Sequence, residues 1–552
     1  MSRAAKAAGA AGAALAGLAT HDLLQKRHAI LRNFPIVGHF RYWLEAVGPE
    51  LRQYIVTSND EERPFSRDEC RWIYASSKGE VNTFGFGTDF DVEGLDSYLV
   101  FEHAPFAHAP PAAHEAGSAP EYLVPCPKVL GGAHGRRHAF RPQSAVNISG
   151  MSYGSLSGPA VESMNRGAAL APCLHNTGEG GLSPHHRHGG ELTFQIGTGY
   201  FGCRDEQGRF SLDRLCERIA EAPVRALEIK LSQGAKPGLG GHLPAAKVTA
   251  EIAAIRGVPE GRDCVSPPRH SAFSDVDSLI EFCETVAGAT GLPIGIKAAV
   301  GRMEFWHELV TRMQETGGGP DFITIDGGEG GTGAAPLAFT DHVALPFKLG
   351  FSRVYSAFAK TGMAEDVVFV GAGRLGLPPF ALFAVVLGCD MVNVGREAML
   401  ATGCIQAQRC HTGRCPTGVA TQSPWLMRGL DPDLKHARVG GYVRALRGEL
   451  LALARSCGVP HPALVGRDQV VIVTEGYTRH TVEEVFGYRE AWRRSPERDA
   501  EIAALIGSAG TAPHPGAEAG PVPGDATGRE LADGEETLAS PSGAEGMATG
   551  GD

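Results

Sequence analysis

Three cysteines within twelve residues are the side chains of this sequence best suited to chemistry. Cys404, Cys410 and Cys415 occur in the run CIQAQRCHTGRCPTGVATQ. Thiolate sulfur is a preferred donor to iron, and a loop with two short steps can turn three sulfurs toward one centre. A cubane with four irons normally takes four cysteines, so three favour a [3Fe-4S] cluster. Inert packing and zinc stay open as alternatives; zinc would need His411 as a fourth ligand, and the spacing is not the paired C-x2-C of structural zinc sites.

Glycines follow two successive candidate strands toward the end of the strand pattern. The run Val367–Val370 leads into Gly371 and Gly373, and the next strand leads into Gly395 and Arg396. Backbone N–H groups at such strand ends, together with a helix N-terminus, are a recurrent way to hold a phosphate-bearing cofactor. A single turn of this kind more often only closes a loop, but the pair favours a phosphate site.

A lysine and a second glycine run end two other candidate strands. Lys297 closes the strand IGIKA, where a cation can stabilise negative charge on a reduced flavin ring; a solvated or ion-paired lysine is the alternative. Gly330 and Gly331 belong to DGGEGGTG (residues 326–333), which follows the strand FITID. Glycines there permit close approach of a planar ligand, although such a loop is a weak signal by itself.

Two cations and one carboxylate occupy further loops. Lys236 follows the strand LEIKL, and Arg256 lies on the helical stretch after it. Two cations over one mouth of a barrel would suit a dicarboxylate. Glu179, in HNTGEGG, is a candidate proton carrier, and a loop carboxylate that caps a helix is an equally common arrangement. The histidines at 185, 186 and 188 imitate a metal site, but a polar surface loop is the prediction there.

The alternation of short β-rich runs with longer helical stretches predicts a (β/α)8 barrel. Nearly every candidate strand ends in Gly, Lys or Asp, at the end where this fold keeps its chemistry. A doubly wound sheet lacks support, because no G-x-G-x-x-G turn follows the first strand. The candidate strands are Val146–Ser149, Leu227–Leu231, Ile294–Ala298, Phe322–Asp326, Val367–Val370 and Met391–Val394.

Composition predicts the arrangement around the barrel. The 552 residues suit one large barrel or two domains, and the 73 glycines suggest many tight turns near a ligand. We expect an Ala/Gly-rich leader over 1–20, a mostly helical N-terminal extension over 21–115 packed on the main domain, the barrel over 116–460 with the cysteine loop at 404–415, a helical region over 461–507 and a disordered tail over 508–552.

Charge and cysteine usage restrict partners and location. A net charge of -11 without a basic face argues against nucleic acid and fits small substrates or a partner protein. The apolar run over 7–19 is too short to span a bilayer and does not form a signal peptide. We expect a cytoplasmic protein, with peripheral membrane association as a weaker alternative. The remaining cysteines are predicted to be buried free thiols: Cys70, Cys126, Cys173, Cys203, Cys216, Cys264, Cys283, Cys389 and Cys457.

Five runs occur in the same order as in a known family. They are GMSYGSLSGPAVESMNRGA, HNTGEGG, SQGAKPGLGGHLPAAKV, DGGEGGTGAAP and GCIQAQRCHTGRCPTGVATQ. Over about residues 141–422 the chain resembles the FMN-binding synthase domain of glutamate synthase, as a stand-alone member. The resemblance implies FMN in the barrel, a [3Fe-4S] cluster on the three cysteines, and 2-oxoglutarate on Lys236 and Arg256 beside Glu179. The residues that would line FMN are Met151, Ser152, Lys297, Gly330, Gly331, Gly371, Gly373, Gly395 and Arg396.

The implied activity is reductive amination of 2-oxoglutarate. Electrons from a ferredoxin or a flavoprotein would reach FMN through the cluster. The family's glutaminase domain begins with a cysteine, whereas this sequence opens Met-Ser-Arg, so ammonia is expected from solution or a separate subunit. His242 stands where the family has a glutamine, which leaves open a flavin enzyme for another amine or oxo acid. A non-catalytic electron-transfer subunit is the third hypothesis.

Overall fold

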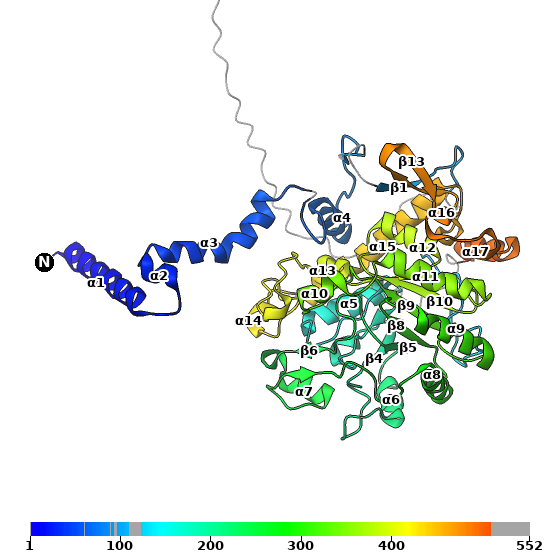
Figure 1. Cartoon of the computed structure of the whole chain (residues 1–552), viewed down its shortest axis with the longest axis horizontal. Coiled ribbons are helices and arrows are strands. Elements are labelled where there is room, and N and C mark those ends of the chain that lie inside the picture. The colour runs from blue at the N-terminus through cyan, green and yellow to red at the C-terminus, as the bar shows by residue number, and fades with distance from the viewer. Residues whose placement is uncertain (1, 60, 89, 93–96, 110–122, 509–552) are drawn as a thin grey trace, which may run out of the picture. The chain divides into compact units, whose positions relative to one another are not determined.

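The computed structural model describes residues 2–59, 61–88, 90–92, 97–109 and 123–508. Within these ranges no helix is both long and apolar enough to cross a membrane. The barrel domain occupies the middle of this range, with helices before it and a mixed α/β segment after it (Figure 1).

Eight parallel strands close into a barrel, as the sequence predicts. Around the barrel the order is β10-β11-β2-β3-β4-β5-β8-β9, and β9 pairs with β10 to complete the circle. Because all eight run in one direction, their carboxyl ends meet at a single mouth. The strands are β2 (Val146–Ile148), β3 (His175–Asn176), β4 (Leu192–Ile196), β5 (Val224–Lys230), β8 (Ile294–Ala298), β9 (Phe322–Asp326), β10 (Val368–Ala372) and β11 (Met391–Val394).

The six strands predicted from the sequence are all present: β8, β9 and β11 have the predicted ends, and the ends of β2, β5 and β10 are shifted. The sequence pattern missed β3 and β4. Strand β3 has only two residues, too few to show a periodic pattern. Its neighbour β4 pairs with β5, and the pairing is irregular between Leu192 and Thr193.

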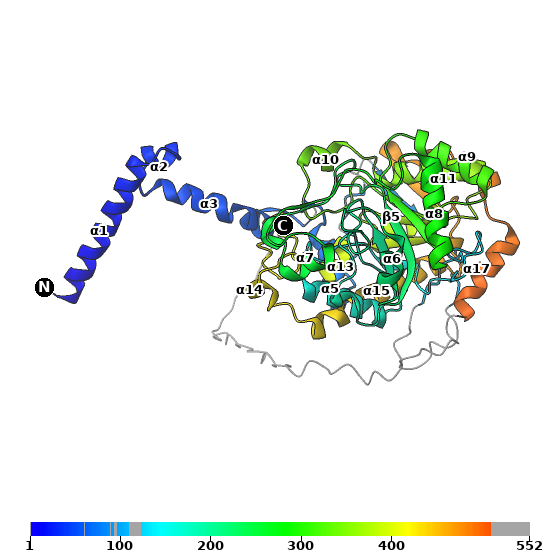
Figure 2. The ribbon, with the colours of Figure 1, turned by 90° about the horizontal axis from the view of Figure 1, so that it is seen from below.

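Helices surround the strands in both views (Figures 1 and 2). Local signals set their ends: α8 begins at a capping box of Asp275 and Ser278 and stops at Gly291, whose φ of 73° is a left-handed C-terminal cap. The barrel helices are α5 (Gly158–Leu170), α6 (Leu212–Ile219), α8 (Val276–Thr290), α9 (Glu304–Thr316), α11 (Phe347–Lys360), α12 (Pro378–Leu387) and α13 (Arg396–Thr402).

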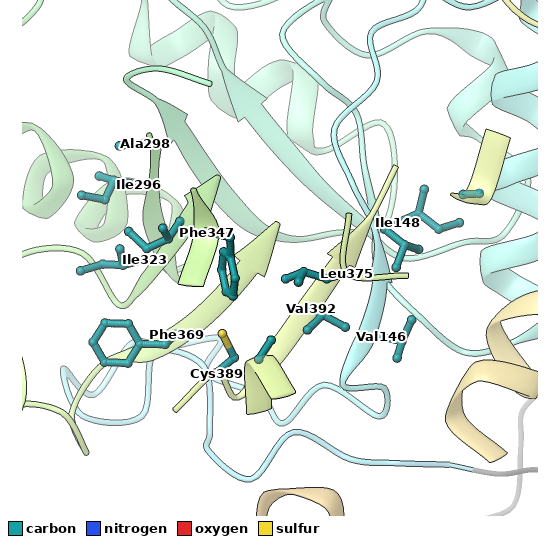
Figure 3. Close-up of a cluster of buried hydrophobic side chains, with 14 of the residues drawn as sticks. Val146, Ile148, Ile296, Ala298, Ile323, Phe347, Phe369, Leu375, Cys389 and Val392 are labelled. Atoms are coloured by element: carbon teal, nitrogen blue, oxygen red, sulfur yellow. The ribbon is translucent and has the colours of Figure 1, made fainter. Parts of the chain in front are cut away.

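The main hydrophobic core lies between the strands and these helices. Figure 3 shows one part of it, in which Val146 and Ile148 of β2 and Val392 of β11 lie in the same cluster as Phe369 of β10 and Cys389. Strands β8 to β10 are buried along their whole length. A barrel built on such strands holds its mouth rigid, which a binding site requires.

The N-terminal extension is helical over much of its length as far as Lys78, and no helix follows in the described residues up to 109. Its helices are α1 (Arg3–Leu24), α2 (Ala29–Asn33), α3 (Gly38–Leu51), the π-helix η1 (Arg52–Val56) and α4 (Arg67–Lys78). Helix α4 packs against α15 (Pro432–Ser456), where the indole Nε1 of Trp72 donates to Glu449 at 2.7 Å. Asp22 is buried, accepts the backbone N–H of Ile36 at 2.9 Å and bonds His39 at 3.0 Å.

The region over 461–507, expected to be helical, is mixed instead. It contains β12 (Val470–Thr474) and β13 (Thr478–Thr481), which form a three-stranded antiparallel sheet with β1 (Ser97–Phe101) of the extension. The β-branched run VVIVT explains the strand, because such side chains pack well on a pleated surface. Two helices follow, α16 (Val482–Phe486) and α17 (Pro496–Ser508), and the predicted tail beyond Ser508 lies outside the described residues.

The loops at the barrel mouth carry short elements of their own. Between β5 and β8 the chain forms β6 (His242–Leu243), α7 (Ala250–Arg256) and β7 (Cys264–Val265), with β6 and β7 paired antiparallel. Helix α10 (Leu337–His342) follows β9, and α14 (Pro424–Met427) follows the cysteine loop.

Candidate active site

A cavity at the mouth of the barrel collects most of the residues that the sequence singles out. Of those predicted residues, Gly330, Gly371, Cys404 and Cys415 do not line it. The ones that do are Met151, Ser152, Glu179, Lys236, Arg256, Lys297, Gly331, Gly373, Gly395, Arg396 and Cys410. The chain therefore brings residues from several separate loops, from β8 and from α7 to one place.

Lys297 lies on the barrel floor beneath this cavity and is an ion-paired lysine. Its Nζ is 3.4 Å from Oδ2 of Asp326, and both side chains are buried. Burial alone would lower the pKa of Lys297, but the nearby carboxylates of Asp326 and Glu228 outweigh it and raise the pKa. The ammonium group is therefore a permanent positive charge on the cavity floor.

The glycine turns divide into one that is packed in the core and two that line the cavity. A side chain at Gly371 would collide with Leu375 and Phe347, so the absence of a side chain here serves core packing, and the contact of Gly371 with a cofactor stays a prediction. Gly373 and Gly395 both line the cavity and are partly exposed. Gly373 has a φ of 116°, a conformation in which a side chain is strained, and a side chain at Gly395 would meet Ser149 at 3.5 Å, an ordinary contact. Backbone at these two strand ends is therefore accessible to a ligand.

Two arginines stand beside these turns, and the sequence identified only one as a site residue. Arg396 donates from Nη2 to the backbone oxygen of Glu329 at 2.5 Å. Arg374 also lines the cavity, and its Nη2 donates to both carboxylate oxygens of Glu69 in α4, at 2.8 and 2.7 Å. The position of Arg374 directly after Gly373, at a strand end, could have identified it from the sequence as a candidate site residue. Two guanidinium groups at the glycine turns suit a phosphate group.

Glu179 forms an ion pair with a lysine that sequence reasoning missed. Lys230 Nζ lies 2.7 Å from Oε1 of Glu179 and 2.7 Å from Oε1 of Gln233. Lys230 is the last residue of β5, six residues before Lys236. A charged residue at the end of a barrel strand could have identified it as a candidate site residue. Burial alone would raise the pKa of Glu179, but Lys230, then Lys236 and Arg256, lower it overall. Glu179 is therefore held as a carboxylate.

Replacing Lys230 with methionine should shift the acid limb of activity toward higher pH. Because the pKa of Glu179 lies below its ordinary value of 4.5, the carboxylate is still ionised at pH 4.5. It becomes protonated only as the pH falls through the lower folded-state pKa. Without the strongest stabilising cation, burial should dominate and raise the pKa of Glu179. The check is the pH profile of kcat/KM between pH 4 and 8. An acid limb at the same pH in both proteins would contradict the assignment of Glu179.

The other two cations lie around the same carboxylate. Lys236 is buried, and burial together with the nearby Lys230 lowers its pKa. Arg256 is buried as well; its Nη2 donates to the backbone oxygen of Tyr153 at 3.0 Å, and its guanidinium lies 5.1 Å from the centre of the Phe201 ring. Within the described part of the chain, Nε of Arg256 has no hydrogen-bond partner. Both cations thus retain capacity for an added anion.

The cysteine loop has donors directed at its sulfurs. Cys415 is buried. Burial opposes ionisation of its thiol, but hydrogen bonds from Thr417 and from the backbone of Ala420 and Val419 outweigh it and lower the pKa. Burial raises the pKa of Cys404 to about 12, although Sγ accepts the N–H of Gln406 at 3.4 Å. N–H groups on sulfur are common around bound clusters.

The predicted cluster is not confirmed by this geometry. Among the described residues, no group of three or more His, Cys, Asp or Glu side chains is placed to hold a metal ion. The three cysteines are near enough to influence one another's charge, because Cys410 and Cys415 both act to raise the pKa of Cys404. The donor chemistry therefore fits an iron–sulfur group, and its assembly stays a prediction.

Lys247, which the sequence reasoning did not single out, connects this loop to the cavity. Its buried Nζ donates to the backbone oxygens of Ser155, Cys410 and Ala420 at 3.3, 2.9 and 3.0 Å. These oxygens come from the loop after β2 and from both sides of Cys415. One ammonium group thereby fixes the cysteine loop against the wall of the cavity.

Replacing Lys247 with methionine should release that loop. Three carbonyl oxygens would lose their donor, and each buried group left unpaired costs about 1–3 kcal/mol. Cleavage by trypsin after Arg409 and Arg414 should therefore accelerate by about tenfold or more, because about 1.4 kcal/mol is a factor of ten. Lys360→Met, at the end of α11, is the matched control. Equal cleavage rates in the two variants would show that Lys247 does not hold the loop.

The histidine run is a surface loop only in part, because His188 is exposed and His186 is not. His186 is fully buried, with Nδ1 2.8 Å from the hydroxyl of Ser183, and its ring lies beside that of His175 at 5.4 Å between centroids. His185 stays partly exposed, 3.6 Å from Glu251. Burial lowers the pKa of His186 well below its usual range, so it packs as a neutral ring.

His242 lines the cavity near its rim. Its Nε2 lies 3.4 Å from Oδ2 of Asp263, and half of its side chain is exposed. The pairing of β6 with β7 fixes its position. The residue that departs from the family pattern is therefore one that a bound substrate can meet.

The family model and the curated relatives that match this chain carry the same family description. The family model described as the conserved region in glutamate synthase matches residues 129–460. Among curated proteins, the glutamate synthase large subunit-like protein YerD of Bacillus subtilis is 38% identical over 478 residues, which cover 82% of this chain and 91% of that protein. The archaeal glutamate synthase (NADPH) of Methanocaldococcus jannaschii is 34% identical over 320 residues, 57% of this chain and 59% of its own length.

The chain thus spans about three fifths of the archaeal relative and nearly all of YerD. Among solved structures, a mutant flavocytochrome b2 with pyruvate bound has a TM-score of 0.38 and 14% identity, covering 83% of this chain and 90% of that one. That likeness is too distant to bear on the site.

Proposed function

Since the chain belongs to the glutamate synthase family through its conserved region, we propose that it is an FMN-dependent oxidoreductase that reductively aminates 2-oxoglutarate or a similar dicarboxylic 2-oxo acid. The observation that carries the proposal is the charge of the cavity. Around Glu179, the three cations Lys230, Lys236 and Arg256 outnumber its one carboxylate, which leaves two positive charges in this part of the cavity for a substrate with two carboxylates.

The cavity also fits FMN in its chemistry. Accessible backbone at Gly373 and Gly395, next to Arg374 and Arg396, suits the phosphate, and Lys297 provides a fixed cation on the floor. Met151 and Ser152, which also line the cavity, would lie against the cofactor. When bound, FMN would supply the hydride that reduces the imine of the 2-oxo acid and ammonia.

The protein's own residues would position the substrate and move protons. Lys236 and Arg256 would bind its carboxylates and fix the orientation of the oxo carbon. The carboxylate of Glu179 would be available to accept a proton as ammonia adds to that carbon, because the surrounding cations keep it ionised. Lys230 holds Glu179 in place during this transfer.

Electrons would enter at the cysteine loop. The sulfurs of Cys404, Cys410 and Cys415 would hold a [3Fe-4S] cluster, which would pass electrons from a ferredoxin or a flavoprotein donor to the cavity. Cys410 supports this path, since it lines the cavity and belongs to the loop at once. Ammonia would come from solution or from a separate subunit. We also propose that the protein is cytoplasmic.

The direct test uses protein purified without oxygen. Iron and flavin are counted per chain, the flavin is reduced, and its absorbance is followed after addition of 2-oxoglutarate and ammonia. Reoxidation of the flavin with formation of glutamate is the expected result. Protein without flavin, or a reduced flavin that neither compound reoxidises, would refute the proposed activity.

His242 supports a second candidate, the same chemistry on a different oxo acid. Because His242 lies at the cavity rim, His242→Gln should change KM between 2-oxo acids by about tenfold while kcat changes less, since a change of one contact is worth about 1–3 kcal/mol. Steady-state kinetics with 2-oxoglutarate, oxaloacetate and pyruvate measures the effect. An unchanged ratio of KM values would exclude His242 as a specificity residue.

A further inference from the structure

Glu228 is a buried acid inside the barrel that the proposed reaction does not use. It lies in β5, two residues before Lys230, and is only 1% exposed. Burying a carboxylate is costly unless hydrogen bonds offset the loss of water. Its partners therefore show what the barrel gains from it.

Three neutral groups from three other strands bond to Glu228. Oε1 accepts Nδ2 of Asn176 at 2.8 Å and Nε2 of Gln195 at 2.7 Å, and Oε2 accepts the hydroxyl of Thr324 at 2.7 Å. Gln195 is also the register partner of Glu228 across the β4–β5 pair. Three donors converging on two oxygens is the pattern of an ionised carboxylate, which can only accept.

This arrangement fixes the orientation of Gln195, which lines the cavity. Because Glu228 accepts a hydrogen bond from the amide nitrogen of Gln195, Oε1 of Gln195 must point elsewhere. This oxygen accepts no hydrogen bond from the described part of the chain. Gln195 thus keeps a free acceptor, whereas Lys297 in the same wall is a donor and a cation. The pyrimidine edge of a flavin, with one N–H and adjacent acceptors, matches that pair.

The charge of Glu228 acts on the same floor. One buried lysine, Lys297, is influenced by two buried acids, Asp326 and Glu228, so the acids outnumber the cation beneath the cavity. Asp326 bonds Lys297 directly, and Glu228 acts through space. An additional negative charge under the cofactor opposes the negative charge that a flavin gains on reduction.

We propose that Glu228 is a positioning residue that orients Gln195 toward the flavin N3–H and lowers the reduction potential of the bound flavin. The inference rests on the proposed function only in that FMN occupies the cavity. It does not depend on the substrate or on the cysteine loop.

The test compares FMN-loaded wild-type protein with Glu228→Gln and Glu228→Asp by equilibration with redox dyes. Glu228→Gln removes the charge at nearly constant volume. It should increase the affinity for reduced FMN relative to oxidised FMN by about tenfold, which raises the reduction potential of the two-electron couple by about 30 mV. Glu228→Asp keeps the charge and should stay within about twofold of the wild type. A Glu228→Gln potential equal to that of the wild type would overturn the inference and leave the proposed activity intact.

A second measurement needs no change at Glu228, in case that variant fails to fold. Wild-type protein is loaded with FMN labelled with 15N at N3, and exchange of N3–H with water is followed by NMR. Slow exchange that becomes fast in Gln195→Leu is the expected result. Fast exchange in the wild type would show that Gln195 is not oriented toward the flavin. Protein that binds no FMN at all would refute the proposed function together with this inference.

Discussion

Replacement of Lys236 by methionine should reduce kcat/KM for 2-oxoglutarate by about a hundredfold or more. Lys236 is buried beside Glu179 and Lys230, so an anion bound there is shielded from water and depends on the protein's cations. Truncating one partner of a buried charge pair costs about 2–5 kcal/mol, which corresponds to about 30-fold to several thousandfold. The loss should appear mainly in KM, because the cation binds a carboxylate distant from the reacting carbon.

The design separates binding from folding. Lys360→Met removes an exposed lysine at the end of α11 and should leave kcat/KM unchanged. A 2-oxo acid with a single carboxylate should lose less than 2-oxoglutarate does in the Lys236 variant. If both substrates lose activity equally, or neither does, Lys236 does not bind the second carboxylate.

The second large effect concerns the cysteine loop. Cys410→Ser should abolish stoichiometric iron and reduce turnover driven by a protein electron donor by about a thousandfold or more, because a cluster with three thiolate ligands cannot lose one without losing its hold on iron. Bound FMN should remain, and dithionite should still reduce it, since Cys410 contributes only one edge of the cavity wall. Iron analysis, visible absorption and donor-dependent kinetics measure the three quantities.

Cys216→Ser is the matched control, since Cys216 is a partly exposed free thiol on α6, far along the sequence from the loop. Its iron content and kinetics should equal those of the wild type. Full iron in Cys410→Ser would contradict the ligand assignment. Loss of iron without loss of donor-driven turnover would show that electrons reach the flavin by another route.

Part of the site could be predicted because the chemistry sits where strands end. Strand-end glycines and cations such as Gly373, Gly395 and Lys297 stand out in a linear sequence, since the parallel barrel requires every strand to end at one mouth. Lys230 and Arg374 carried the same signal and were overlooked. The mixed segment after residue 461 was missed because β12 gains its partner β1 from a segment more than three hundred residues earlier.

The sequence by itself determined the barrel, the family and the three-cysteine loop, because periodicity, strand-end residues and short motifs are local properties. Only the tertiary structure decided which of these groups meet. The pairing of Lys230 with Glu179, the contact of Lys247 with both sides of Cys415, and the convergence of three donors on Glu228 join residues from separate strands and loops. Such contacts depend on register and closure of the barrel, and these properties arise only when all eight strands are in place.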